Sequence, residues 1–309
     1  MSVAFLFPGQ GSQFPGMLHA LPEHSAITRT LDEVSEILGT NCRELDSPQA
    51  LQSSVSVQLA LLASGVAMTR ALHEEGIEPG AVAGMSAGAY SAAITCGVLS
   101  LADGVHLVRQ RAEMMVKLFP TGFGLAAIVG LNELQVSELV QQVHSKQTPV
   151  YVANVNAPRQ IVISGSNEGI ERVLQAALKS GARKAERLDV STPSHCPLLQ
   201  PVADALEESL QAMDLQAPKI VYLGNITGRA IRSTEGISED LAANIAHGVR
   251  WYDMTTVLDE LGFRLFLEMP PGHVLSVLAK DAFPDVQTLP LGEASIRQAL
   301  RIVDRYAVN

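Results

Sequence analysis

The residues from Ala81 to Tyr90 read as a short buried strand, a Gly-x-Ser-x-Gly turn and the start of a helix. This arrangement presents Ser86 on a sharp turn, with Gly84 and Gly88 allowing the strand and the helix to pack closely. The next backbone N–H, that of Ala87, is then positioned to hold an oxyanion. A chance match to the pattern in a chain with 24 glycines is the alternative. The segment predicts a nucleophilic serine at a strand-to-helix junction.

Apolar runs of strand length alternate with helical segments along most of the chain. This alternation predicts an α/β fold with a mainly parallel sheet. The expected strands are residues 3–7, 82–84, 220–223 and 265–268. The expected helices are residues 56–74, 101–118, 197–213, 239–246 and 252–261, and the small apolar residues 91–98 fit a helix packed on a sheet. These elements form the larger body of the protein.

The segment 122–190 has a different rhythm. Its pattern predicts strands at 125–129, 150–156, 160–166 and 185–188, with helices at 133–144 and 167–180. The resulting order, βαββαβ, is that of a ferredoxin-like unit. We therefore expect a large α/β domain made of residues 1–121 and 191–309, with residues 122–190 inserted as a small ferredoxin-like α+β domain.

The composition of the chain limits the kinds of molecule that it is expected to bind. Hydrophobic residues make up 47% of the chain and charged residues only 17%, which is typical of a well-buried globular protein. The low charge indicates, as a hypothesis, that a partner subunit covers part of the surface. A formal net charge of -10 without a Lys/Arg cluster argues against nucleic acid or an anionic membrane. Small metabolites or protein carriers fit better.

Cysteine content and hydropathy predict a soluble, cytoplasmic protein. Cys42, Cys96 and Cys196 have neither a metal-binding spacing nor the even count of a disulfide framework, which favours a reducing compartment. The apolar start lacks a basic region and stops at Pro8-Gly9, so it reads as a strand rather than a signal peptide. The longest apolar candidate for a membrane span, residues 59–68, is interrupted by Ser64-Gly65.

A serine nucleophile needs a base, and His195 is the leading candidate among the eight histidines. It lies in the segment 191–197, between the end of a strand and the start of a helix, where loops carry functional groups. The alternative is a helix-entry histidine with structural hydrogen bonds. Sequence spacing does not show that Ser86 and His195 meet, but both lie at junctions of one predicted parallel sheet.

Two further segments carry candidate binding groups. Residues 7–13 (FPGQGSQ) form a glycine-rich turn with exposed backbone amides. We expect one of these amides to donate a hydrogen bond to an oxyanion. Phosphate binding fits less well, because the lysine of a P-loop is missing. Arg109 and Arg111 lie two positions apart on one expected helix and point to different faces, so at most one enters a cleft. By default each would be a solvated surface charge.

Taken together, these motifs make the chain similar to the malonyl-CoA:acyl-carrier-protein transacylases over essentially its full length. The matching motifs occur in order at residues 7–13, 84–92, 108–111, 193–195, 249–251 and 268–272. The resemblance implies a hydrolase-like large domain with a ferredoxin-like insertion, in agreement with the periodicity. It also implies malonyl-CoA and an acyl carrier protein as partners, and no metal or redox cofactor.

The roles that the resemblance implies form a coherent site. Ser86 would attack the thioester of malonyl-CoA, and His195 would take its proton and later return it to the CoA thiol. The backbone N–H groups of Gln10 and Ala87 would hold the oxyanion. Arg111 would bind the free malonyl carboxylate. The prosthetic-group thiol of the carrier would then take the malonyl group from the serine.

Departures from the family pattern lie next to these residues. Asn244 stands where a glutamine is frequent, and its side-chain oxygen would orient His195. The alternative is that Asn244 is an ordinary helix residue. Met85 and Ala89 replace a histidine and a glutamate, which would remove polarity near the serine. Ser194, the residue before His195, is small, as in the malonyl-selective members of the family, where a small residue leaves room for the carboxylate.

Some of these features favour one branch of the family. Ala89, residues 123–130 and Pro270-Pro271 look like the malonyl transferase subunit, epsilon or H, of bacterial malonate decarboxylase. That branch implies transfer to the carrier subunit of the decarboxylase and contact with its other subunits. The alternative is the transacylase of fatty-acid synthesis. A serine thioesterase or other hydrolase lacks a recognisable acidic triad member here, and a non-catalytic scaffold is the third class.

Overall fold

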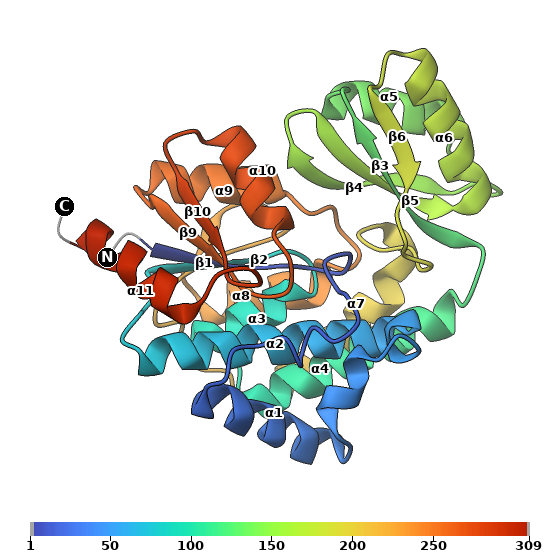
Figure 1. Cartoon of the computed structure of the whole chain (residues 1–309). Coiled ribbons are helices and arrows are strands. Elements are labelled where there is room, and N and C mark those ends of the chain that lie inside the picture. The colour runs from blue at the N-terminus through green and yellow to red at the C-terminus, as the bar shows by residue number, and fades with distance from the viewer. Residues whose placement is uncertain (1–2, 308–309) are drawn as a thin grey trace.

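The computed structural model describes residues 3–307 of the chain and contains two sheets in separate parts of the molecule (Figure 1). The strands of the larger sheet are β1 (Val3–Phe7), β2 (Ala81–Gly84), β7 (Val221–Leu223), β8 (Ala230–Ile231), β9 (Leu265–Glu268) and β10 (Gln287–Pro290). Their order is β10-β9-β1-β2-β7-β8, and all neighbours are parallel except the last pair. The predicted α/β fold with a mainly parallel sheet is confirmed.

Helices cover both faces of this sheet, as the uninterrupted apolar run of β1 requires. Phe5 and Phe7 point into one core, whereas Ala4 and Leu6 point into the other. The first core is closed by α1 (Ser25–Leu38), α2 (Ser54–Glu74), α3 (Gly88–Thr95), α4 (Leu101–Leu118), α7 (Gln200–Gln211), α8 (Thr234–Ala243) and α11 (Ile296–Ala307). The second is closed by α9 (Trp251–Glu260) and α10 (Val274–Ala282). Short 3₁₀ turns span Cys42–Asp46, Ala50–Gln52 and Pro197–Leu199.

Helix α2 runs through the centre of the first core and corrects one expectation. Ser64-Gly65 does not interrupt it, because both residues lie inside one continuous helix. Gly65 lies where the Phe7 ring and Ser91 approach the helix closely. By length and composition α2 could span a membrane, but 83% of its most apolar window is buried. Its apolar surface is therefore covered by the protein itself.

The second sheet is antiparallel. Its strands are β3 (Phe123–Val129), β4 (Val150–Ala157), β5 (Gln160–Ser166) and β6 (Lys184–Arg187), in the order β4-β5-β3-β6. Helices α5 (Glu133–Val143) and α6 (Asn167–Lys179) pack on one face around a separate core. The predicted succession of strands and helices is the one observed. We call these elements the small unit, and the remaining described elements the large unit.

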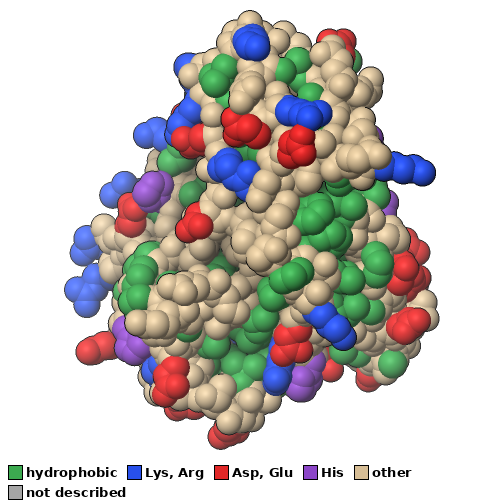
Figure 2. All heavy atoms as spheres, turned by 90° about the vertical axis from the view of Figure 1, so that its right-hand side faces the viewer, with side chains coloured by type: hydrophobic (Ala, Val, Ile, Leu, Met, Phe, Trp, Pro, Cys, Tyr) green, Lys and Arg blue, Asp and Glu red, His purple; other side chains and the backbone are tan. Residues whose placement is uncertain are grey.

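The two units are joined by backbone hydrogen bonds on one side. The N–H of Val155 donates to the carbonyl of Val249 at 2.9 Å, and the N–H of Val249 donates to the carbonyl of Ala153 at 2.8 Å. Next to this contact, Arg250 pairs with Glu133 of α5 at 2.6 Å. On the face of the molecule in Figure 2, acidic and basic side chains are interspersed around hydrophobic ones.

Helix α8 differs from its prediction. It spans Thr234–Ala243 rather than residues 239–246, because the Ser233 side chain accepts a hydrogen bond from the N–H of Gly236 and begins the helix earlier. Asn244 is the residue that ends the helix. Its position brings the backbone of Asn244 next to His195, as described below.

Candidate active site

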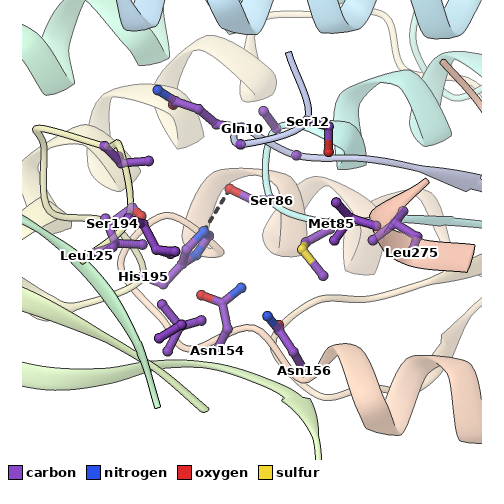
Figure 3. A pocket seen from close by; sticks show the side chains of 18 of the residues that line it. Gln10, Ser12, Met85, Ser86, Leu125, Asn154, Asn156, Ser194, His195 and Leu275 are labelled. Carbon is purple, nitrogen blue, oxygen red and sulfur yellow. Dashed lines mark hydrogen bonds between the residues drawn. The ribbon is translucent and has the colours of Figure 1, made fainter. Parts of the chain in front are cut away.

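A cavity of about 250 Å³ lies where the large unit meets the open face of the small sheet. The large unit contributes the turn after β2, the loop after β1 and the segment around His195, whereas β3, β4 and β5 contribute the opposite wall (Figure 3). The residues that line it are Gly9, Gln10, Gly11, Ser12, Met85, Ser86, Ala87, Arg111, Met115, Leu125, Ala127, Asn154, Asn156, Gln160, Val162, Leu188, Val190, Ser194, His195, Val274 and Leu275.

Ser86 lies on the predicted sharp turn, with φ of 55°. Two glycines make this turn fit. A Cβ on Gly84 would lie 2.2 Å from the carbonyl oxygen of Gly88, and one on Gly88 would lie 2.3 Å from that of Phe7. No side chain can occupy either position, so β2, α3 and the end of β1 approach one another as closely as the motif predicts.

His195 contacts the serine directly. Its Nε2 lies 2.7 Å from Ser86 Oγ (Figure 3). Its Nδ1 lies 2.7 Å from the backbone carbonyl oxygen of Asn244. Because a carbonyl oxygen only accepts, Nδ1 carries the proton and Nε2 is free to accept the proton of the serine. Burial, together with the charge of Arg111, lowers the pKa of His195 to about 4. The imidazole is therefore neutral at pH 7.

The contact with Asn244 corrects the sequence interpretation. The predicted partner of His195 was the side-chain oxygen of Asn244, but the observed partner is its main-chain oxygen. Both polar atoms of the Asn244 side chain are buried without a hydrogen bond among the described residues. Asn244 thus orients His195, as predicted, but it does so through a main-chain hydrogen bond at the end of α8.

Arg111 is the arginine that enters the cleft. It is 1% exposed, and its Nη2 donates to Ser86 Oγ at 3.0 Å. Its Nη1 donates to the side-chain oxygen of Gln58 on α2, and the sulfur of Met115 lies 3.6 Å away. Arg109 instead lies on the surface and pairs with Glu113. The Arg111 guanidinium therefore presents a buried positive charge beside the nucleophile.

Gln10 and Ala87, the predicted oxyanion donors, both line the cavity. Within residues 3–307, neither backbone N–H has a protein acceptor. Gly9 brings the loop after β1 against the turn, because a Cβ there would lie 2.8 Å from the carbonyl oxygen of Met85. Their role in holding an oxyanion stays a prediction.

Met85, Ala89 and Ser194, which the sequence analysis singled out, have different surroundings. Met85 lines the cavity with an apolar side chain. Ala89 is fully buried in the core of the large unit and does not line the cavity. Ser194 lines the cavity, and its N–H donates to Ser164 Oγ of β5 at 2.9 Å.

Sequence reasoning missed four polar residues of the site. Gln58 holds Arg111, Asn225 accepts the N–H of Ser86 at 2.9 Å, and Asn154 and Asn156 line the small-unit wall with unpartnered, buried side-chain oxygens. Two signals were available. Gln58 is a polar residue inside a long apolar helical run, and Asn225 follows directly after a buried parallel strand, where functional groups gather.

The geometry defines what the site can do. A serine hydroxyl that donates to a neutral imidazole is an activated nucleophile, and free backbone N–H groups nearby can stabilise an oxyanion. A buried guanidinium next to the nucleophile selects an acyl group that carries a negative charge. These features together favour covalent acyl transfer.

Comparison with known sequences agrees with this chemistry. A sequence model of the acyl transferase domain family matches residues 4–295. The chain is 36% identical to the malonyl CoA-acyl carrier protein transacylase of Bacillus subtilis over 296 residues, which cover 94% of this chain and 93% of the relative. It is 33% identical to the protein of the same description from Escherichia coli K12 over 302 residues, with 96% and 97% covered.

Solved structures show the same architecture. The malonyl CoA-acyl carrier protein transacylase of Coxiella burnetii superimposes with a TM-score of 0.93 at 32% identity, covering 99% of this chain and 98% of the other. A malonyl-transacylase in complex with a type II PKS acyl-carrier protein has a TM-score of 0.93 at 32% identity, with 98% and 100% covered.

Proposed function

Because the chain belongs to the acyl transferase domain family and is an acyltransferase, we propose that it transfers a malonyl group from malonyl-CoA to the thiol of an acyl carrier protein. The observation that carries this proposal is the pair of contacts at one oxygen. Ser86 Oγ meets His195 Nε2 at 2.7 Å and Arg111 Nη2 at 3.0 Å. A nucleophile, its base and a cation for the acyl carboxylate thus meet at one point.

The first half of the reaction forms a malonyl-serine ester. Ser86 Oγ attacks the thioester carbon while His195 Nε2 takes the hydroxyl proton. The oxyanion accepts hydrogen bonds from the N–H groups of Gln10 and Ala87. When the C–S bond breaks, the departing CoA sulfur takes the proton from His195. The site is then ready for a second thiol.

The second half is the reverse of the first. The carrier thiol gives its proton to His195 and its sulfur attacks the malonyl-serine carbonyl. The C–O bond to Ser86 then breaks, and the serine oxygen recovers the proton. Arg111 holds the malonyl carboxylate in both halves, because its guanidinium offers a pair of N–H donors that match the two carboxylate oxygens.

The identity of the acceptor carrier distinguishes two readings. The names of the relatives support a general malonyl-CoA:acyl-carrier-protein transacylase, such as that of fatty-acid synthesis. The sequence features that favoured the malonate decarboxylase branch have no such support, and one of them, Ala89, does not line the cavity. We therefore favour the carrier of fatty-acid synthesis. Faster transfer to a purified malonate decarboxylase carrier subunit would reverse this choice.

Intact-protein mass after brief incubation with malonyl-CoA tests the reaction class. We expect a malonyl adduct on the wild type that is absent in Ser86→Ala. Ser12→Ala is the matched control, because Ser12 lines the same cavity and should keep the adduct. No adduct on the wild type would contradict the proposal and favour a scaffold, whereas malonate released faster than the carrier is acylated would indicate a hydrolase.

A further inference from the structure

The backbone of Ser86 is strained and must be held in place. A φ of 55° is a left-handed conformation, which is unfavourable for a residue with a side chain. If the turn relaxed, Ser86 Oγ would leave its positions 2.7 Å from His195 Nε2 and 3.0 Å from Arg111 Nη2. The surrounding structure must therefore supply contacts that keep the turn in this conformation.

One side chain bridges the turn. The side-chain oxygen of Asn225 accepts the N–H of Ser86 at 2.9 Å, and its nitrogen donates to the carbonyl of Gly84 at 3.0 Å. A single planar amide thus binds the backbone on both sides of Met85. Asn225 is fully buried, and it reaches this position because β7 pairs in parallel with β2 and Leu223 lies opposite Ala83.

Asp240 faces the nitrogen end of this amide. Its Oδ2 lies 3.5 Å from Asn225 Nδ2 and 3.0 Å from the Tyr222 hydroxyl, and its Oδ1 accepts the N–H of Ile226 at 3.0 Å. Burial raises the pKa of Asp240, and the hydrogen bonds it accepts oppose that rise. A carboxylate is an acceptor only, so it favours the orientation in which the Asn225 nitrogen faces Asp240 and the oxygen faces Ser86.

The same helical turn supports the base. Asp240 and Asn244 lie one turn apart at the end of α8, and the N–H of Asn244 donates to the carbonyl of Asp240 at 3.0 Å. Asn244 in turn holds His195 through its own carbonyl. The last turn of α8 is thus connected to the nucleophile through Asn225 and to the base directly.

We propose that Asn225, oriented by Asp240, is a positioning residue that holds Ser86 in its left-handed conformation with Oγ aligned to His195. The proposal rests on the proposed function, since it assigns these residues to the serine that forms the acyl-enzyme. In this proposal Asn225 aligns the nucleophile and takes no part in binding the substrate. Asn225 does not line the cavity, so its loss should change the rate of acylation and leave the affinity for malonyl-CoA unchanged.

The test compares rates of Ser86 modification in single-turnover experiments. For Asn225→Ala we expect malonyl-serine formation to fall about 10- to 100-fold, in line with the effect of a small misplacement of a reacting group. The concentration dependence of the burst should give an unchanged affinity for malonyl-CoA. Labelling of Ser86 by a fluorophosphonate should slow in parallel, and this second readout does not require malonyl-CoA to be the substrate.

A double-mutant cycle tests the role of Asp240. Asp240→Asn places a donor opposite the Asn225 nitrogen, so it should slow acylation in the wild-type background and add little in the Asn225→Ala background. Tyr222→Phe is the matched control, because it removes a hydrogen bond to Asp240 and leaves both hydrogen bonds between Asn225 and the turn in place. It should lower the thermal unfolding midpoint and leave the rate unchanged.

The outcomes are distinct. A wild-type rate in Asn225→Ala, or effects of the two substitutions that multiply, would overturn the proposal. If Asn225→Ala does not fold, the comparison of Asp240→Asn with Tyr222→Phe decides, and equal acylation rates would overturn it. A wild type that is labelled by fluorophosphonate but forms no malonyl adduct would count against the proposed function alone.

Discussion

The two walls of the cavity differ in chemistry. The wall from the large unit carries Ser86, His195 and Arg111, each held by hydrogen bonds to buried groups. The wall from the small unit carries apolar side chains and the amides of Asn154, Asn156 and Gln160, and the described part of β3, β4 and β5 places no charged side chain in the cavity. The nucleophile, the base and the cation therefore lie on one wall, whereas the other wall offers only neutral side chains.

The largest effect is expected from a charge on the large-unit wall. Arg111→Ala should lower malonyl transfer by about 10- to 100-fold, since a charge-assisted hydrogen-bonded pair contributes about 1.5–3 kcal/mol. Transfer of acetyl, which has no carboxylate, should be unchanged or improved. Acylation rates with the two CoA esters measure both effects.

Arg109→Ala is the control for this experiment, because Arg109 is exposed on the same helix and pairs only with Glu113 among the described residues. It should behave as the wild type. An equal loss of malonyl and acetyl transfer in Arg111→Ala would make Arg111 a structural residue and would weaken the contrast between the walls.

The pH dependence of acylation is the next effect in size. His195 acts as a base only when neutral, and burial together with Arg111 lowers its pKa to about 4. As the pH falls through this value His195 becomes protonated, so the acylation rate should be constant near neutral pH and fall about tenfold per pH unit below the pKa. Stopped-flow acylation, with circular dichroism to monitor folding, measures this profile.

The pH at which the acylation rate begins to fall, the acid limb of the profile, also tests the contribution of Arg111 to the pKa of His195. Removal of the nearby positive charge should raise the pKa of His195, so the limb should move to higher pH in Arg111→Ala. A wild-type limb near the ordinary histidine value of 6.5 would contradict the burial of the base in the working enzyme.

The smallest effect is expected on the small-unit wall. The unpartnered oxygen of Asn154 can accept from an amide N–H of the pantetheine arm, so Asn154→Ala should raise the KM for malonyl-CoA about two- to tenfold, the range of one neutral hydrogen bond. The kcat should stay the same. Tyr151→Phe, on the same strand but outside the cavity, is the control. A fall in kcat alone would break the division between the walls.

The sequence predicted those parts of the site that depend on local geometry. The turn at Ser86 could be read because Gly84 is required by a contact within the motif, with Gly88, although Gly88 itself is required by the distant Phe7. The order of elements in the small unit followed from periodicity, because each apolar run fills a core. In the large unit the sequence did not predict α1, α10, α11, β8 and β10. Arg111 could not be distinguished from Arg109 in this way, since the choice depends on which face α4 turns toward α2.

Contacts between distant segments could not be read from the sequence. Asn225 lies 139 residues from Ser86, and only the parallel pairing of β2 with β7 brings them together. The contact of His195 with Asn244 uses a main-chain carbonyl, which every residue possesses. Residue type therefore gives no signal for this contact, and reasoning from side chains predicted the side-chain oxygen of Asn244 instead of its main-chain oxygen.

The backbone contacts of Val249 with Ala153 and Val155 affect how the two walls move. Pulling them apart would leave buried N–H and carbonyl groups without partners, at a cost of about 1–3 kcal/mol each. We therefore expect the cavity to keep its shape along this edge when the CoA thiol leaves and the carrier thiol arrives. A cavity of one fixed shape would then serve both halves of the transfer reaction. The acyl donor and the acyl acceptor would compete for the same space and bind one after the other.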